Sequence, residues 1–404
     1  MSNLVKIALG ILTSVGGFLE AGSLGTALEA GTSFRYKLLW ALALGAICVA
    51  FLAEMSGRLA AVSKHTVVDA MRKRFGIHAQ AWPLGAQLLV NLLVLASEIG
   101  GAAFALQLAT GVSMRVWALP VVAAIWLVLW RGTFGQIEHG VAVLGLVTGA
   151  FVVAALKLDP DWTAVRSGIM PSLPAGDFAK YAYLAVSILG ASISPYLITF
   201  YASGAVEEDW KKKDLAINRI VAGLGMGFGS TIAAAVMIVA AIVLAPRGIA
   251  LESFDQAADM LNGPLGRAGF WLFCASLFIG CAGAAFEVAL DFAYTISQTF
   301  GWNWGEEQRP AVEARFALMY TLALIVASVP ALLAINPLTL TMFSMGITAL
   351  ALPLVIAPLL VIMNDERFLH DKTNGPISNT AVILIVALSF ILALVAIPLQ
   401  FMGS

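Results

Sequence analysis

The sequence predicts an all-α integral membrane protein with eleven transmembrane helices in a single domain. Of its 404 residues, 60% are hydrophobic and only 12% are charged, with a mean hydropathy of +0.91. The surface of a soluble domain needs more charge than this. Apolar stretches long enough to cross a hydrocarbon core of ~30 Å recur along the chain, at 4–32, 38–61, 82–110, 114–130, 139–157, 179–204, 217–245, 265–299, 315–334, 338–363 and 378–402.

Composition excludes several other classes of protein. The formal net charge of −1 gives no reason to expect nucleic acid as a partner. The three cysteines lie inside apolar stretches and the four histidines lie in or beside polar connections, so neither a disulfide framework nor a zinc cluster is expected. The sequence contains no pairing of a nucleophile with a base. We therefore expect neither an enzyme nor a resident cofactor.

The distribution of lysine and arginine predicts the orientation of the chain. Most of these residues fall in the connections that share the N-terminal side of the bilayer, which places the N-terminus in the cytoplasm. The first twenty residues lack a small-x-small cleavage site, and Glu20 interrupts their apolar run, so they are interpreted as half of a transmembrane helix. We expect a monomer in the lipid bilayer of a bacterial-type inner (plasma) membrane.

Two of the spans are broken near their middle. The first contains Glu20-Ala21-Gly22-Ser23, and the sixth contains Ser192-Ile193-Ser194-Pro195-Tyr196. Because the sixth span opens a second group of five, the breaks occupy corresponding places in two halves. That pattern is typical of inverted-repeat transporters, which bind substrate at unwound midplane segments. It predicts repeat one at about 4–157, repeat two at about 179–363 and an extra helix at 378–402.

The break in the sixth span has a local cause. Pro195 lacks a backbone donor and clashes with the preceding turn, which frees a carbonyl near Ala191. Irregular backbone at this depth is tolerated only where it lines a cavity. The alternative is that both breaks are kinks without function, because glycine and proline are common in membrane helices.

The residues at both breaks resemble the NRAMP family of proton-coupled divalent-metal transporters. The family motifs Asp-Pro-Gly-Asn and Ile-Leu-Gly-Ala-x-x-Met-Pro-His are similar to the two broken segments. Further similarities extend over nearly the whole chain, at Glu29-Ala30-Gly31, Tyr36-Lys37-Leu38-Leu39-Trp40, Glu98-Ile99-Gly100-Gly101-Ala102-Ala103, Ile188-Leu189-Gly190-Ala191 and Ala351-Leu352-Pro353-Leu354. The resemblance implies the LeuT-type 5+5 inverted repeat with broken helices 1 and 6.

The resemblance also implies a set of metal-binding positions. The family binds its metal through an aspartate and an asparagine of the first helix and through an alanine carbonyl and a methionine sulfur of the sixth. Here these positions hold Glu20, Ser23, the Ala191 carbonyl and Ser194. Tyr196 stands where the family has a histidine of its proton path. An oxygen-only set of ligands favours hard cations such as Mg²⁺ or Mn²⁺ over soft metals.

A polar stripe in the eighth span is a second candidate region. Glu287, Asp291, Tyr294 and Gln298 follow at spacings that place them on one helix face. Ionisable residues at membrane depth are costly and suggest function. The stripe predicts a wall of an inner vestibule, with Glu287 near Glu20 and with Asp291 contributing to ion binding. The alternative is that both acids form hydrogen bonds to neighbouring helices.

Two further acids are interpreted from their surroundings. Glu98 lies in the third span with Asn91 on the same face, so both residues are candidates for a proton path or for supporting contacts. A purely structural role for Glu98 is equally compatible with the pattern. Glu54 precedes Arg58 by four residues near a helix end, which predicts a structural ion pair.

The sequence thus predicts a secondary active transporter that moves a hard divalent cation, Mg²⁺ or Mn²⁺, by alternating access. The alternative keeps the same fold but carries an organic solute or organic cation. In that case metal binding would have been lost, and Tyr196 and Tyr201 would supply an aromatic wall for the ligand.

Overall fold

The computed structural model describes residues 20–131, 145–172, 174, 176–248, 251–305, 310 and 312–402. Within these residues every regular element is a helix, which confirms the all-α prediction. Nine of the described helices are long and apolar enough to cross a membrane. The exact number of eleven spans stays a prediction, because residues 4–19 of the first span and residues 139–144 of the fifth lie outside the described residues.

The first half of the chain follows the predicted spans closely. Its helices are α2 (Ala21–Phe34), α3 (Leu39–Ser63), α4 (Val67–Thr110), α5 (Met114–Arg131) and α7 (Ala150–Lys157), the last preceded by the 3₁₀ turn η1 (Leu146–Gly149). Only α4 differs clearly, because it begins well before the predicted start at 82. Gly76 interrupts it with a φ of 79°, a conformation that glycine adopts without a steric penalty. The interruption joins a short polar helix to the long spanning one.

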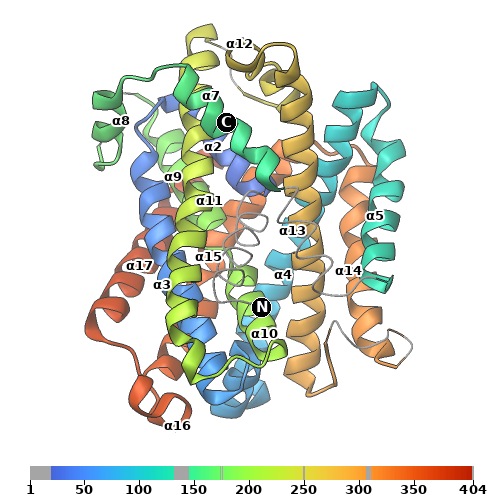
Figure 1. The fold of residues 1–404 in the computed structure, drawn as a ribbon, viewed down its shortest axis with the longest axis vertical. Helices are drawn as coiled ribbons and strands as arrows, with labels where there is room; N and C mark the ends of the chain where they lie inside the picture. The colour runs from blue at the N-terminus through green and yellow to red at the C-terminus, as the bar shows by residue number, and fades with distance from the viewer. Residues whose placement is uncertain are drawn as a thin grey trace.

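The described part of the second half is also built of helices, and they lie close to the predicted spans. Its long helices are α9 (Phe178–Ser192), α10 (Pro195–Glu207), α11 (Leu215–Val243), α13 (Ala268–Phe300), α14 (Ala314–Leu332), α15 (Pro337–Met363) and α17 (Pro376–Met402). Short helices lie at the two ends of the molecule (Figure 1). These are α8 (Trp162–Gly168) and α12 (Asn262–Leu265) at one end and α16 (Glu366–Leu369) at the other.

The helix α4 forms the centre of the bundle. It packs extensively against α13 and α15, and also against α14 and α5. The broken helices lie beside this centre, with α2 against α11 and α9, and α10 against α3 and α13. In Figure 1, α2 and α10 are enclosed by the longer helices. The two breaks are therefore surrounded by protein.

Glycines let the broken helices approach their neighbours closely. A Cβ atom on Gly190 of α9 would collide with the backbone carbonyl of Met345 in α15, and one on Gly31 of α2 would collide with the carbonyl of Met237 in α11. Such backbone-to-backbone contacts are typical of membrane helices that meet at small residues. They fix the positions of the two broken helices.

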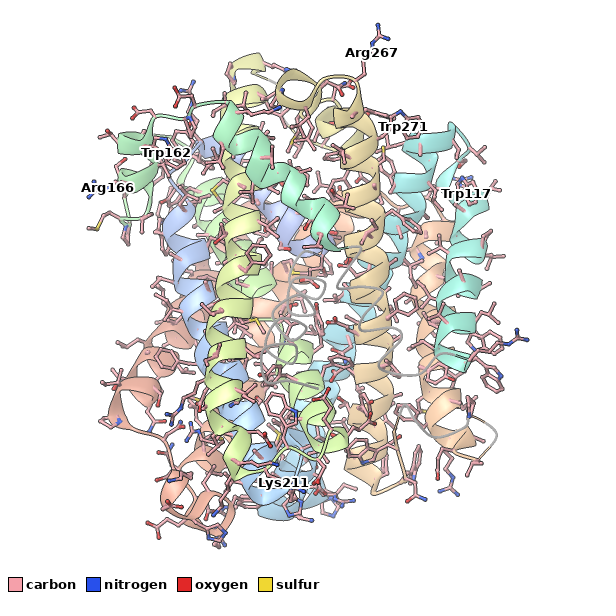
Figure 2. All side chains as sticks on the ribbon, in the orientation of Figure 1. Trp117, Trp162, Arg166, Lys211, Arg267 and Trp271 are labelled. Atoms are coloured by element: carbon pink, nitrogen blue, oxygen red, sulfur yellow. The ribbon has the colours of Figure 1, made fainter. Side chains whose placement is uncertain are left out.

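Aromatic and basic side chains mark the ends of the spans. Figure 2 shows Trp117, Trp162 and Trp271 toward one end of the molecule and Lys211 at the opposite end. Tryptophan is enriched where membrane helices meet the headgroup region. The positions of these residues are consistent with helices that span the membrane along the long axis of the molecule. The cytoplasmic placement of the N-terminus stays a prediction.

Candidate functional site

The break in the first span is fixed by two polar side chains. Glu20 adopts an extended conformation immediately before α2, and Ser23 Oγ accepts a hydrogen bond of 3.1 Å from its backbone N–H. Both carboxylate oxygens of Glu98, from α4, accept from the backbone N–H of Ala21, at 3.0 and 3.1 Å. A carboxylate in this position satisfies a free donor and complements the helix dipole. Glu98 therefore caps the N-terminus of α2.

The carboxylate of Glu20 is buried but only partly hydrogen-bonded. Glu20 is only 1% exposed. Its Oε2 accepts a hydrogen bond of 2.7 Å from the Tyr196 hydroxyl. Its Oε1 has no hydrogen-bond partner among the residues that the structure describes. Burying an ionised carboxylate is costly unless its oxygens are satisfied. This oxygen is thus available to a cation.

The break in the sixth span lies where the sequence predicts it, between the end of α9 and the start of α10. Pro195 opens α10 and cannot donate the hydrogen bond that a continuous helix would send to the Ala191 carbonyl. Ser194 Oγ donates to the carbonyl of Gly190 at 3.4 Å. The Ser192 hydroxyl is buried without a hydrogen-bond partner in the described part of the chain. This break therefore exposes carbonyl and hydroxyl oxygens inside the protein.

The two breaks face each other through the bond between Tyr196 and Glu20. Ser23 belongs to the same cluster through its hydrogen bonds to the backbone of Glu20. Ala191 and Ser194 are buried at the second break, one helical turn or less from Tyr196 along the chain. The structure thus brings both broken segments, predicted as one site, into contact.

Asp291 occupies a separate and fully satisfied cluster. It is 0% exposed. Its Oδ1 accepts from the Thr199 hydroxyl at 2.6 Å, and its Oδ2 accepts from the side-chain amides of Asn91 at 2.8 Å and Gln87 at 3.0 Å. These donors come from α10 and α4. In this conformation Asp291 therefore connects three helices and does not line an open vestibule, and Asn91 serves the same contact.

The rest of the polar stripe on α13 is also engaged with its neighbours. Glu287 lies one turn before Asp291 on α13 and is buried. The Tyr294 hydroxyl donates to Glu207 of α10 at 3.0 Å, and Gln298 accepts from a threonine at the start of α4. The stripe therefore connects α13 with α10 and with the start of α4.

The predicted ion pair between Glu54 and Arg58 is confirmed. The Nη2 atom of Arg58 lies 3.0 Å from Oε2 of Glu54, and the same guanidinium donates to the side chain of Asn374. Glu29, at the far end of α2, is paired with Lys180 at 3.3 Å. Both acids thus have basic partners, whereas no basic partner is recorded for Glu20 in the described residues.

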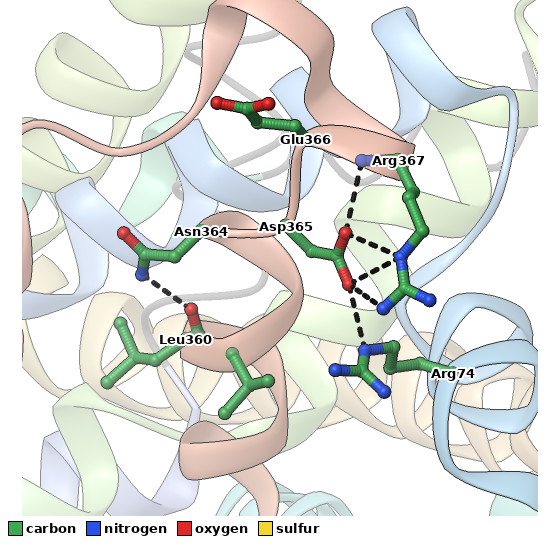
Figure 3. A pocket seen from close by; sticks show the side chains of 7 residues that line it. Arg74, Leu360, Asn364, Asp365, Glu366 and Arg367 are labelled. Atoms are coloured by element: carbon green, nitrogen blue, oxygen red, sulfur yellow. Dashed lines mark hydrogen bonds and ion pairs between the residues drawn. The ribbon is translucent and has the colours of Figure 1, made fainter.

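A surface pocket lies at the α16 end of the molecule, and none of its lining residues belongs to either break. Figure 3 shows Asp365 held between two arginines. Its Oδ2 lies 2.5 Å from Nη2 of Arg367 and 2.8 Å from Nε of Arg74. Hydrogen bonding to Arg367 above all holds the pKa of Asp365 well below its usual range. The acid of this pocket is therefore paired with arginines, and the pocket is not part of the candidate site.

The described residues contain no group of three or more histidine, cysteine, aspartate or glutamate side chains that could hold a metal ion. A cation at Glu20 would therefore take at least some of its ligands from hydroxyls, carbonyls or sulfur. Sequence reasoning did not include Met345, a fully buried residue of α15 beside the first break. No local sequence pattern distinguishes it from the other 12 methionines of the chain.

Comparisons with known proteins agree with this architecture. The sequence model described as natural resistance-associated macrophage protein-like (Nramp) matches residues 10–398. A relative from Caldanaerobacter subterraneus, named divalent metal cation transporter MntH, is 25% identical over 393 residues, which cover 93% of this chain and 88% of the relative.

Solved structures show the same fold. A manganese transporter from Eremococcus coleocola superposes with a TM-score of 0.79 at 18% identity, covering 98% of this chain and 87% of that one. Mhp1, a nucleobase-cation-symport-1 family transporter, superposes with a TM-score of 0.62 at 16% identity, covering 97% and 91%. Both likenesses support the LeuT-type fold. With the family match over nearly its whole length, the chain belongs to the Nramp family and is a membrane transporter, not an enzyme.

Proposed function

We propose that this protein is a secondary active transporter of a divalent metal cation, with Mn²⁺ as the favoured cargo, and that it works by alternating access. One observation carries the proposal. A buried carboxylate oxygen of Glu20 lacks a protein partner at the point where the two broken helices meet. A divalent cation would satisfy this oxygen and compensate the buried charge.

The ligand roles follow from the chemistry of the two breaks. The Glu20 carboxylate supplies the charge, Ser23 and Ser194 offer hydroxyls, and Ala191 offers the carbonyl released by Pro195. Tyr196 orients the carboxylate through its hydrogen bond of 2.7 Å. Oxygen donors of this kind suit Mn²⁺ and Mg²⁺. The names of the relatives, a divalent metal cation transporter and a manganese transporter, support Mn²⁺ as the first candidate.

The positions of the proposed ligands support alternating access. They belong to two discontinuous helices in different halves of the chain, as in transporters that rock one group of helices against another. The Tyr196–Glu20 hydrogen bond links these helices. A movement of α10 relative to α2 therefore changes the surroundings of the bound ion directly.

The organic-cation alternative is not favoured by these findings. In that alternative, Tyr196 and Tyr201 would supply an aromatic wall for the ligand. Tyr196 is instead 0% exposed with its hydroxyl directed to Glu20, and the Tyr201 hydroxyl is hydrogen-bonded to Asn218 at 2.9 Å. The Tyr196 ring is thus enclosed by the protein, and the Tyr201 hydroxyl is already engaged by Asn218.

Uptake into proteoliposomes that contain the full chain tests the proposal. We expect saturable Mn²⁺ uptake, competition by Cd²⁺, weaker competition by Mg²⁺, and none by a panel of organic ammonium ions. Empty liposomes are the control for leak. Uptake of an organic cation in the absence of any metal transport would contradict the proposal.

A further inference from the structure

The surface pocket at the α16 end of the molecule combines charged and apolar side chains. Its volume is about 740 Å³, and its lining includes two arginines and two acids together with Leu360 and Val361 of α15. The pocket lies just beyond the end of α15 at Met363, where a spanning helix reaches the headgroup region of a bilayer. The proposed cation site uses none of these residues, so the pocket needs a separate explanation.

An apolar stripe on the outside of α15 leads into this pocket. Leu354 and Val361 are 47% and 46% exposed, and Ala357 between them is also exposed. Their spacings of three and four residues place them on one helix face, which Asn364 continues at the end of the helix. Exposed apolar faces of this kind contact membrane lipid. A lipid chain on the stripe would therefore place its headgroup at the pocket.

The two arginines of the pocket retain donors for a ligand. Asp365 accepts from Nε of Arg74 and from Nε and Nη2 of Arg367. In the described part of the chain, no hydrogen bond is recorded for the Nη1 atom of either arginine. The guanidinium group is well suited to phosphate, which it binds through pairs of N–H donors. Asp365 thus holds two guanidinium groups next to each other, and both can still donate to one phosphate.

Glu366 brings the opposite charge to the same pocket. It is exposed, and its side chain has no recorded hydrogen bond or ion pair among the described residues. Figure 3 shows its carboxylate turned away from Asp365 and the arginines. Because the charges of two arginines and two acids cancel, the lining offers no net attraction to an anionic headgroup. A zwitterionic headgroup, by contrast, meets both of its charges there.

We propose that this pocket binds the headgroup of phosphatidylethanolamine, with the phosphate on Arg74 and Arg367 and the ammonium on Glu366. The acyl chains lie along the apolar stripe of α15. A primary ammonium has three N–H donors for a carboxylate, whereas the trimethylated ammonium of phosphatidylcholine has none. Since Arg74 belongs to α4 and Arg367 to α16, the bound phosphate connects two distant parts of the chain and stabilises the fold. The proposal is independent of the transported ion.

A network of surface ion pairs that only attaches α16 to α4 is the competing explanation. Exposed ion pairs of this kind contribute little to stability, and they need no lipid. The two explanations differ in their dependence on the headgroup. An ion-pair network predicts the same stability in every lipid, whereas the proposed site predicts a preference for one headgroup.

The experiment measures the apparent Tm of the delipidated full chain in detergent. Phosphatidylethanolamine, phosphatidylcholine and phosphatidylglycerol with identical acyl chains are added separately, and free phosphoethanolamine is added in a fourth series. We expect phosphatidylethanolamine to raise the Tm most, by about 3 °C, because a ligand stabilises the folded state that binds it. Equal shifts with all three lipids, or a larger shift with phosphatidylglycerol, overturn the proposal. An equal shift with phosphoethanolamine at the same concentration also overturns it, because the acyl chains would then play no part.

Variants of the pocket locate the effect. Glu366→Gln should reduce the shift with phosphatidylethanolamine to that with phosphatidylcholine, and Arg367→Gln should reduce both shifts. Asp371→Asn is the matched control, because this acid lies in the same connection outside the pocket and is paired with Lys372. A preference for phosphatidylethanolamine that survives in Glu366→Gln contradicts the proposal. Native mass spectrometry of the wild type with an equal mixture of the three lipids tests the headgroup preference without any variant, and equal retention of the three would likewise refute it.

Discussion

Glu20 and Asp291 are both buried acids next to α10, but their hydrogen bonding differs. Asp291 accepts three hydrogen bonds, which occupy both of its oxygens. Glu20 accepts a hydrogen bond from the Tyr196 hydroxyl on Oε2, and its Oε1 has no hydrogen-bond partner in the described residues. An acid whose oxygens are satisfied by the protein holds helices together, whereas one with an orphaned oxygen keeps its capacity for a cation. Burial alone therefore does not identify the binding site.

The same helix connects the two acids. Tyr196, the donor to Glu20, and Thr199, the donor to Asp291, are three residues apart in the first turns of α10 and lie on one face. A displacement of α10 therefore reaches both acids at once. The comparison can be tested by removing the charge of each acid or the hydroxyl that donates to it. Cation affinity and protein stability are then measured separately.

The largest effect is expected from Glu20→Gln. This substitution keeps the volume of the side chain but removes its charge, so the principal ligand is lost. Mn²⁺ uptake should fall to the level of empty liposomes, while the apparent melting temperature in detergent stays close to that of the wild type. Glu29→Gln is the matched control, because Glu29 lies on the same helix but is paired with Lys180. Wild-type uptake by Glu20→Gln would remove Glu20 from the site.

A smaller effect is expected from Tyr196→Phe. The ring remains, but Glu20 loses the hydrogen bond that orients its carboxylate. Such a bond contributes about 1 kcal/mol, which corresponds to about a fivefold weaker Mn²⁺ affinity. Calorimetric titration measures the change. A loss of affinity as complete as that in Glu20→Gln would mean that Tyr196 binds the ion itself.

The breaks could be predicted from the sequence because their causes are local. An acid beside glycine and a proline within an apolar run stand out from the surrounding helix formers, and both lie at corresponding places in the two predicted repeats. The ion pair of Glu54 and Arg58 was predictable for the same reason, since its partners are four residues apart. Most of the helix ends also follow from local sequence, and α4 departs from the prediction only because Gly76 joins a polar helix to it.

The contacts between distant segments could not be predicted in this way. Periodicity identified Asp291 as part of a polar face, but its donors Asn91 and Gln87 lie about 200 residues away. Only the packing of α13 against α4 brings them together. Met345 gives no signal at all in the sequence, because its place beside the breaks depends on Gly22 and Gly190 lying against it. The spatial arrangement also changes the expected role of Asp291 from a vestibule wall to a connection between helices.

Asp291→Asn distinguishes these two roles. The amide keeps the size of the side chain and can accept on its oxygen, while the Thr199 hydroxyl can reverse its own direction. If Asp291 serves as a connection between helices, Mn²⁺ affinity should stay within about threefold of the wild type, a change below 1 kcal/mol. The apparent melting temperature should fall, because hydrogen bonds to a charged acceptor are stronger than those to an amide. A loss of affinity above tenfold at unchanged stability would make Asp291 a cation ligand.

The smallest effect is expected from Thr199→Val, which tests whether the two acids act independently. Valine has nearly the shape of threonine but cannot donate to Asp291 Oδ1, so one of three hydrogen bonds is lost while Asn91 and Gln87 keep the other oxygen occupied. The cost in stability should be about 1–3 kcal/mol, because one buried acceptor is left unsatisfied. Mn²⁺ affinity should not change, since Tyr196 still orients Glu20. Ser203→Ala, one turn further along α10, is the matched control for removing a buried hydroxyl. If Thr199→Val weakens Mn²⁺ binding although Ser203→Ala does not, then α10 transmits the state of Asp291 to Glu20, and the two acids form one coupled site.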